Sequence, residues 1–272
     1  MVLRSGSYGA SGETTTVNAS GTAAAPITFV GDPSGGRAAL AGYIRITGSH
    51  LRLANLLFDG PTGRVLPVTA DNPGGEEVKV SVMYGSDVEI RSSEVRGGRW
   101  HAGIYVNDAT DVRLLSNHIH DNGDRSNPAQ ANYDHGIYWC SGSGVVAHNL
   151  IESNVSYGVH LYPTAAGVSV TRNTIVGNGK GGVIVADRAS GNRIADNVIA
   201  HNALSGIKGY NLKGEGNVAT GNVLWANGSR DFDGSGIALS GNVQTDPKFV
   251  GGGDYRVQAG SPAAYAGAFG TL

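Results

Sequence analysis

Histidine and tyrosine recur at matching places in this 272-residue chain, and both side chains can transfer protons in an enzyme site. Three of them stand third in a Gly-Ile-x or Gly-Val-x segment, namely Tyr105, Tyr138 and His160. Another histidine or tyrosine lies just ahead of each segment, at His101, His135 and Tyr157. If the fold gathers these side chains, the set predicts general acid–base chemistry, in which one group removes a proton and another supplies one.

An asparagine pattern identifies the elements that must position these side chains. The pattern Asn-x-apolar-x-x-Asn occurs five times, and subtracting residue numbers separates its leading asparagines by 32, 24, 24 and 25 residues: Asn117, Asn149, Asn173, Asn197 and Asn222. We expect their amides to stack at a corner of each coil, since asparagine hydrogen-bonds along a stack and tolerates the left-handed backbone of sharp corners. One coil therefore has about 24 residues.

Two strand patterns keep step with the asparagines. Gly-Ile-x or Gly-Val-x segments occupy residues 103–106, 136–139, 158–161, 182–185, 206–208 and 236–239. A third strand is expected at residues 88–90, 112–114, 145–147, 168–170 and 192–194. Together with 43 glycines and only 15% charged residues, these patterns predict an all-β fold. The expected architecture is a right-handed parallel β-helix solenoid with three short strands per coil, forming a single domain over residues 1–272.

Alternation along the Gly-Ile-x strands predicts which side chains face outward. With Ile104, Val106 and their equivalents inward, a first outward column reads Ser81, Tyr105, Tyr138, His160, Ile184 and Lys208. A second column reads Met83, Asn107, Cys140, Tyr162, Ala186 and Tyr210. Insertions at residues 59–78 and 121–135, with a smaller one at 228–235, lengthen the connection into these strands. We therefore expect a groove walled on one edge.

These repeats resemble those of the carbohydrate-active right-handed β-helix superfamily, which includes pectate lyases, alginate lyases and mannuronan epimerases. The segment from Asp246 to Gly267 resembles the way in which many bacterial members close their last coil, and Val2 to Tyr8 resembles an early strand of the solenoid. Matching segments cover roughly residues 26 to 267. The resemblance implies an extended groove that binds an acidic polysaccharide or oligosaccharide.

A uronic-acid polymer carries a weakly acidic proton beside its carboxylate, and removing that proton starts β-elimination or epimerisation. The run from Asp134 to Tyr138 resembles the neighbourhoods of alginate-acting enzymes, although the Asp-Pro-His signature of the epimerases is absent. We expect Tyr138 to be proton donor or base, with His160 or His135 as partner, provided that neighbouring cations or hydrogen bonds lower the tyrosine pKa. Asp134 would orient His135 or act itself. Substrate-binding residues are expected at Tyr105, His101, Asn107, Tyr157, Tyr162, Arg125 and Lys208, among which Asn107, Arg125 or Lys208 would pair with the carboxylate.

Other readings stay open at this stage. A uronate C5-epimerase would use the same first step. A calcium-assisted lyase would need Asp108, Asp124, Asp134 and Asp187 to converge, and a glycoside hydrolase would need a carboxyl pair such as Asp108 and Asp134. A non-catalytic carbohydrate-binding or surface module, with aromatic side chains in the groove but no titratable group of shifted pKa, is the alternative of another class. The stacked Tyr105, Tyr138 and His160 would serve only as cross-strand packing in a further alternative. No metal site is expected, although His118-x-His120 offers two imidazoles, and calcium is the one cofactor considered.

Charge and composition bear on partners and compartment. A formal net charge of −2 argues against nucleic acid as a partner, and no apolar run long enough for a membrane span is found. Cys140 is the single cysteine, so an intrachain disulfide is excluded. We expect a monomer or homo-oligomer that is secreted or periplasmic, because polymeric substrates lie there, although this sequence begins without a signal-peptide pattern.

Overall fold

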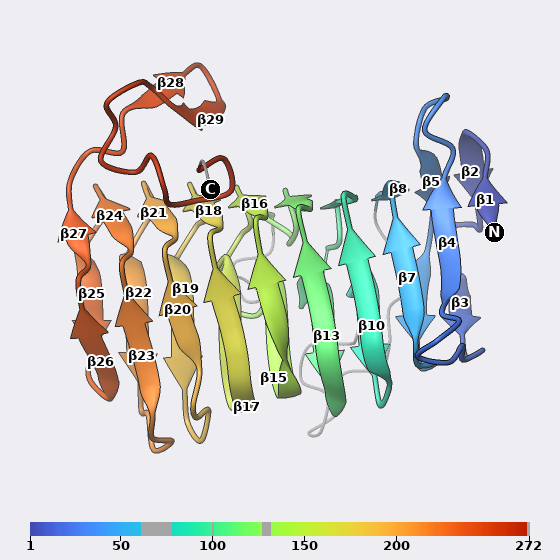
Figure 1. Ribbon diagram of the computed structural model, residues 1–272, viewed down its shortest axis with the longest axis horizontal. Coiled ribbons are helices and arrows are strands. Elements are labelled where there is room, and N and C mark those ends of the chain that lie inside the picture. The colour runs from blue at the N-terminus through green and yellow to red at the C-terminus, as the bar shows by residue number, and fades with distance from the viewer. Residues whose placement is uncertain (61–77, 100, 127–131, 271–272) are drawn as a thin grey trace.

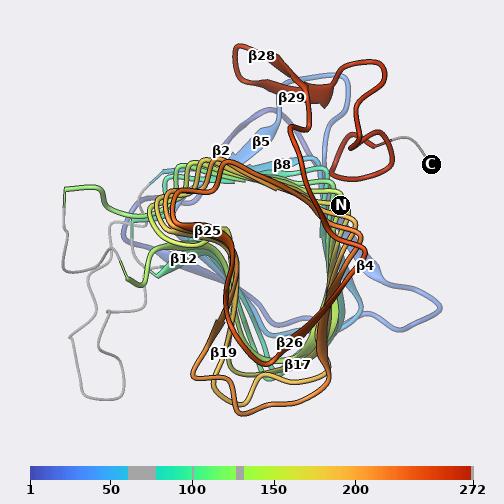
Figure 2. The same cartoon turned by 90° about the vertical axis from the view of Figure 1, so that its left-hand side faces the viewer.

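Parallel strands stacked coil upon coil build the protein. The computed structural model describes residues 1–60, 78–99, 101–126 and 132–270. Successive coils lie side by side along the long axis (Figure 1), and viewed along that axis they superimpose around one shared interior (Figure 2). The predicted solenoid of short parallel strands is therefore confirmed. No helix long and apolar enough to cross a membrane occurs in the described ranges.

The strands form a 17-stranded sheet, which comprises two rows, and a 10-stranded sheet. The first row contains β3 (Thr14–Val17), β6 (Tyr43–Ile46), β9 (Val80–Met83), β12 (Ala102–Asn107), β19 (Gly181–Ala186), β22 (Ser205–Tyr210) and β25 (Arg230–Gly234). The second row contains β1 (Val2–Leu3), β4 (Ile27–Gly31), β7 (Leu51–Ala54), β10 (Ser86–Arg91), β13 (Ala109–Leu115), β20 (Arg193–Ala195), β23 (Asn217–Thr220) and β26 (Ile237–Ser240). Two long strands run through both rows, β15 (His135–Ala147) and β17 (Val159–Thr171).

The 10-stranded sheet completes each coil and is called the third sheet below. Its strands are β2 (Gly6–Tyr8), β5 (Ala38–Leu40), β8 (Leu56–Phe58), β11 (Glu94–Arg96), β14 (His118–His120), β16 (Leu150–Glu152), β18 (Thr174–Val176), β21 (Val198–Ala200), β24 (Val223–Trp225) and β27 (Val243–Gln244). The three predicted strands per coil are thus present, with the first two fused in β15 and β17.

The interior is filled by the alternate apolar residues that the strand pattern placed inward. The predicted inward positions of the first row, from Val80 and Val82 to Val183 and Val185, are all fully buried in one continuous core. Trp139 is the largest fully buried side chain. Burial of such side chains stabilises by roughly 1.5–3 kcal/mol each, so the core fixes which residues of each strand must face outward.

Two ladders of asparagine amides run through the corners on either side of the third sheet. In one, the Asn149 side-chain oxygen accepts the backbone N–H and amide of Asn117, at 2.8 and 3.1 Å, and Asn173 repeats this on Asn149. A parallel ladder joins Asn122, Asn154, Asn178, Asn202 and Asn227. The predicted stacking is confirmed. The left-handed backbone, however, falls on the residue before each amide, such as Ser116, His148 and Arg172.

The chain departs from prediction near its end. Residues 228–235 are not an insertion, because β25 continues the first row there and pairs Phe232 with Ile207. The Gly236-Ile237 segment belongs instead to the second row, where Ile237 pairs with Asn217. Since Phe232 supplies the inward apolar residue of the last first-row strand, the next Gly-Ile segment falls one strand later. The glycine pattern alone did not separate the two rows.

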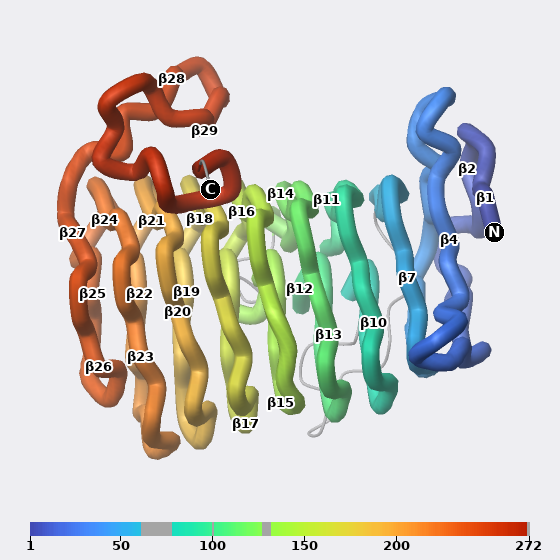
Figure 3. Tube along the Cα trace, viewed as in Figure 1, coloured from blue at the N-terminus to red at the C-terminus, as the bar shows by residue number. Residues whose placement is uncertain are grey.

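The C-terminal segment lies along the side of the solenoid and does not close its last coil. A short antiparallel pair, β28 (Phe249–Gly251) and β29 (Asp254–Val257), is followed by turns that run back beside β21 and β18 (Figure 3). Ala263 and Ala266 pack against Val198 and Val223 on the outer face of the third sheet. This face is therefore covered over several coils, whereas the outward face of the first row carries Tyr105, Tyr138 and His160.

Candidate active site

The residues of the first predicted column lie in register on neighbouring strands. Tyr105 pairs in register with Tyr138, and Tyr138 with His160. Ser81 precedes them, and Ile184 and Lys208 follow. Neighbouring strands are about 4.8 Å apart, so the three rings lie side by side on one face.

Not every member of the column reaches solvent. Tyr105, Tyr138, His160 and Lys208 are half-buried, whereas Ser81 is fully buried and Ile184 is 4% exposed. The expectation that all alternate residues face water was therefore wrong at both flanks of the aromatic stretch. The continuous stretch of half-buried rings in this column therefore lies on β12, β15 and β17.

The phenol ring of Tyr138 is held between two imidazole rings. His101 stacks on it with ring centroids 5.3 Å apart and planes inclined by 18°, and His160 stacks on the other side at 5.1 Å and 15°. Tyr105 meets the same ring edge-on at 5.4 Å. Such offset and edge-on contacts stabilise aromatic pairs beyond their burial, so the orientation of Tyr138 is fixed by its neighbours.

Burial decides the protonation states of this cluster. It lowers the pKa of His101 to about 4 and that of His160 to about 3, and holds the pKa of His135 well below its usual range. Burial also raises the pKa of Tyr138, with smaller contributions from Cys140, Tyr162 and Tyr133. Three neutral imidazoles therefore surround a protonated phenol at neutral pH. Among the described residues, neither a cation nor a hydrogen bond lowers the pKa of Tyr138, so the condition for a base is not met and the proton-donor role is favoured.

His135 lies behind His160 and fixes its ring. His135 is 1% exposed, and its Nε2 lies 2.8 Å from Nδ1 of His160. The Tyr157 backbone N–H donates to Nδ1 of His135 at 3.4 Å, so this nitrogen carries no proton and Nε2 does. His135 then donates to His160, whose own proton must reside on Nε2. The buried ring thus selects the tautomer of the half-buried one.

Asp134 holds the backbone around the site. Its side chain is fully buried, with one oxygen accepting the His101 N–H and the other the Asp124 N–H, both at 2.9 Å. Burial raises the pKa of Asp134 to about 6, against the lowering effect of these two hydrogen bonds. The orientation of His135, which we expected from Asp134, is set by Tyr157 and His160 instead. A carboxyl pair of Asp134 with Asp108 is disfavoured, because both Asp134 oxygens face backbone amides.

The expected carboxylate-binding residues are already engaged in part. Lys208 forms an ion pair with Asp233 at 2.8 Å, and Arg125 is exposed and donates to the Ser153 carbonyl at 2.6 Å. Asn107 accepts from the Ser141 hydroxyl at 2.9 Å. Tyr162 is more exposed and stacks on His160 at 5.4 Å. Of this set, the tyrosines and His101 join the cluster, whereas Lys208 and Arg125 bind other protein groups.

The walls predicted from the insertions lie largely outside the described residues. Residues 61–77, which make up most of the first insertion, and residues 127–131, about a third of the second, are not described. From the second insertion, Tyr133 approaches His101 with ring centroids 6.0 Å apart, and Asn132 accepts a hydrogen bond from Lys180. The described part of this insertion therefore borders the aromatic cluster.

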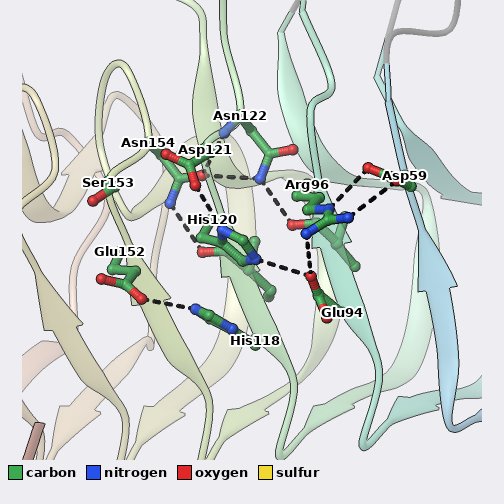
Figure 4. Close-up of polar contacts among 12 residues, drawn as sticks. Asp59, Glu94, Arg96, His118, His120, Asp121, Asn122, Glu152, Ser153 and Asn154 are labelled. Atoms are coloured by element: carbon green, nitrogen blue, oxygen red, sulfur yellow. Dashed lines mark hydrogen bonds and ion pairs between the residues drawn. The ribbon is translucent and has the colours of Figure 1, made fainter. Parts of the chain in front are cut away.

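The His118-x-His120 pair belongs to a different surface, the outer face of the third sheet. Figure 4 shows both imidazoles turned toward carboxylates: His118 lies 2.8 Å from Glu152, and His120 lies 3.3 Å from Glu94 and 2.8 Å from Asp121. Asp121 directly follows His120 in the sequence, whereas Glu152 and Glu94 come from adjacent coils. In the part of the chain that the structure describes, no three His, Cys, Asp or Glu side chains are placed to hold a metal ion.

One cationic residue on the outward face of the first row was not identified from the sequence. Arg45 pairs in register with Ser81, which places it in the outward column on the N-terminal side of Ser81. Its position was hidden because 36 residues, by subtraction, separate it from Ser81, whereas the period is about 24. The alternation of Ile44 and Ile46 around it was the available signal, since both are buried in the core.

Comparisons with known proteins agree on the architecture. A family model described as the right handed beta helix region matches residues 44–197. Among solved structures, pectate lyase Pel9A is similar over 98% of this chain and 82% of its own, with 16% identity and a TM-score of 0.69. An alginate lyase from a Paenibacillus strain is similar over 84% of this chain and 90% of its own, with 15% identity and a TM-score of 0.57.

A mutant of the periplasmic alginate epimerase AlgG is similar over 79% of this chain and 51% of its own, with 15% identity and a TM-score of 0.60. No curated protein sequence matches the chain. At these identities the structural likeness extends to the fold, while the family model covers more than half of the residues. The chain therefore belongs to the family of proteins with a right-handed β-helix region.

Proposed function

We propose that this protein is a polysaccharide lyase that cleaves a uronic-acid polymer by β-elimination on the outward face of β12, β15 and β17. The observation that carries the proposal is the protonated phenol of Tyr138 stacked between the neutral imidazoles of His101 and His160. Similar solved structures include a pectate lyase and an alginate lyase, which supports an acidic polymer as substrate.

Proton abstraction falls to His101 in this proposal. Neither ring nitrogen of His101 has a hydrogen-bond partner among the described residues, so its tautomer is free to present a lone pair. Burial lowers its pKa to about 4, but an anionic sugar beside the ring would raise that pKa toward the range useful for a base. The imidazole takes the proton from the carbon next to the uronate carboxylate.

Tyr138 and His160 complete the step. As the carbon–hydrogen electron pair forms the new carbon–carbon double bond, the glycosidic oxygen leaves with the electrons of its own bond and takes the phenol proton of Tyr138. His160, with Nε2 protonated by virtue of its bond to His135, donates to the substrate carboxylate and stabilises the charge that develops there. His101 ends protonated and Tyr138 deprotonated, and solvent restores both.

The same site geometry supports a place outside the cytoplasm, where such polymers occur. One of the similar structures is a periplasmic enzyme of alginate. The tyrosines beside the reacting set, Tyr105 and Tyr162, offer ring faces on which sugars can stack.

The test is incubation with polymannuronate, pectate and chondroitin while following the ultraviolet absorbance of the unsaturated sugar end. We expect the absorbance to increase with one polymer. The rate of this increase should be about 10²–10⁴-fold lower in Tyr138→Phe and in His101→Gln, because each change removes an acid–base group. The matched control is His201→Gln, which changes an exposed histidine in another corner of the coil.

The alternatives give different results. Exchange of the sugar proton with heavy water without absorbance growth would replace the lyase by an epimerase. Binding without either reaction would reduce the site to a carbohydrate-binding surface. Full activity of Tyr138→Phe would refute the assigned acid.

A further inference from the structure

We propose that Arg45 forms an anion-recognising subsite on the N-terminal side of Ser81 in the outward column and binds a second carboxylate of the polymer, away from the bond that is cleaved. This inference rests on the proposed function, because it takes the cleaved bond to lie at Tyr138. It adds a substrate-recognition residue that the acid–base chemistry does not require.

The first step is the alignment of Arg45 with the reacting set. Arg45 pairs with Ser81, Ser81 with Tyr105, and Tyr105 with Tyr138, all in parallel register. Three strand spacings of about 4.8 Å therefore separate the backbones of Arg45 and Tyr138. The distance from the guanidinium to the Tyr138 ring also depends on how the long arginine side chain is extended. An extended polymer that follows the column from Tyr138 reaches Arg45 without changing direction.

The second step is that no described residue accepts a hydrogen bond from Nε of Arg45. Arg45 is half-buried, and its Nε is a buried donor without a hydrogen-bond acceptor in the described structure. Arg52, Arg96 and Arg113, by contrast, each bind carboxylates of neighbouring coils. A buried donor without an acceptor costs stability, so a site that keeps one has a use for it when a ligand is bound.

The third step is the chemistry around Arg45. The adjacent residue in the column is Ser81, whose Oγ lies 2.5 Å from the hydroxyl of Tyr43, two residues before Arg45 on the same face. The two cross-strand neighbours of Arg45, Ser81 and Thr16, thus both carry hydroxyl groups. A planar guanidinium with hydroxyl neighbours matches a carboxylate, which it can bind with two parallel N–H bonds.

Lys208 makes the contrast at the other end of the column. It lies two strands beyond His160 in the same register, but Asp233 neutralises it at 2.8 Å. Of the two cations in the column, Lys208 is therefore neutralised, whereas no described carboxylate pairs with Arg45 in the N-terminal half. This asymmetry predicts that the polymer's acidic units on that side contribute more to binding than those on the other.

The experiment measures the affinity of oligomers of mannuronate and of galacturonate by calorimetry in a Tyr138→Phe background, which prevents turnover. Arg45→Gln is compared with Arg45→Lys and with Arg193→Gln, which removes one positive charge from an exposed position on β20. Loss of a charge-assisted, bidentate contact predicts a 10–100-fold weaker affinity for long oligomers in Arg45→Gln, a smaller loss in Arg45→Lys, and none in Arg193→Gln. Dimers too short to reach Arg45, and oligomers whose carboxyl groups are reduced to alcohols, should bind all variants equally.

Unchanged affinity of Arg45→Gln for long uronate oligomers, with circular dichroism showing a folded variant, would overturn the inference and leave the lyase proposal intact. Failure of every uronate oligomer to bind the parent protein would overturn both. A loss confined to sulfated oligosaccharides would assign the subsite to sulfate and overturn the carboxylate. Equal weakening for dimers and long oligomers would place Arg45 at the reacting sugar, which also contradicts the inference.

Discussion

His135 offers the sharpest test of the site, because it acts only through another residue. In His135→Phe, His160 loses the donor that lies 2.8 Å from its Nδ1, and the Tyr157 N–H loses its acceptor at 3.4 Å. His160 is then free to carry its proton on Nδ1 instead of Nε2. In the proposed reaction this removes one hydrogen bond to the developing charge on the carboxylate, which predicts a loss of about 10²–10³-fold in kcat.

The same change also affects folding. Two polar groups, Nδ1 of His160 and the Tyr157 N–H, are left without partners in a buried place, and each such group costs about 1–3 kcal/mol. We therefore expect His135→Phe to unfold with a free energy lower by about 2–5 kcal/mol. His135→Gln has an amide that can both donate and accept at this position, so it should restore part of the stability and part of kcat.

Two measurements separate positioning from structure. Nitrogen chemical shifts of the His160 ring report its tautomer, and we expect a protonated Nε2 in the parent protein and a mixture in His135→Phe. Lyase kinetics at saturating substrate then report kcat, with urea unfolding as the measure of stability. The reasoning is refuted if the parent His160 carries its proton on Nδ1, or if His135→Phe keeps the parent kcat while the tautomer has changed.

Further predictions concern stability and pH. Asn173→Ala removes the acceptor of the Asn149 N–H and the donor to the Val146 carbonyl in a fully buried ladder. Urea unfolding should show a free energy of unfolding lower by about 3–5 kcal/mol, against about 1 kcal/mol for Asn242→Ala at the half-buried end of the ladder. Equal losses in the two variants would contradict this reasoning. The lowered pKa values of His101 and His160, about 4 and about 3, mean that the unfolded chain binds protons first as the pH falls below about 6.5. Thermal unfolding should therefore show a stability that is complete above pH 6.5 and lost progressively toward pH 3, less steeply in His160→Gln; a Tm that is independent of pH over this range would be inconsistent with neutral buried imidazoles. Asp134→Asn keeps one carbonyl oxygen but points an amide at a backbone N–H, so we expect a loss of about 1–3 kcal/mol by urea unfolding and a weaker effect at pH 5, where the parent carboxyl is largely protonated.

The repeat made most of the fold predictable. A strict period and strand alternation together determine which residues of each coil meet, and Tyr105, Tyr138 and His160 were aligned correctly for this reason. Prediction failed where the period did. The insertion between Arg45 and Ser81 concealed that both occupy one column, and the last coil displaced the Gly236 segment to another row.

The electrostatics of the site could not be taken from the sequence. Whether an outward tyrosine is acid or base depends on how deeply its neighbours bury it, and the burial of Tyr138 between two rings raises its pKa, which favours the donor over the base role that the sequence left open. The partners of His118 and His120 illustrate the same limit, since Glu152 and Glu94 are remote in sequence and are brought close only by stacking. Register predicts neighbours, but burial and hydrogen bonding decide what those neighbours do.

The asparagine ladders bear on how such a molecule can change its length. Each asparagine side chain accepts the same hydrogen bonds from its neighbour in the adjacent coil, so one additional coil with asparagine at the same two positions would continue both ladders through the same kind of contacts. Duplication or loss of a segment of about 24 residues is therefore the smallest length change that the interior accepts. Because every turn also adds one strand to the outward face, the number of sugar units that the surface can accommodate would grow in whole-turn steps.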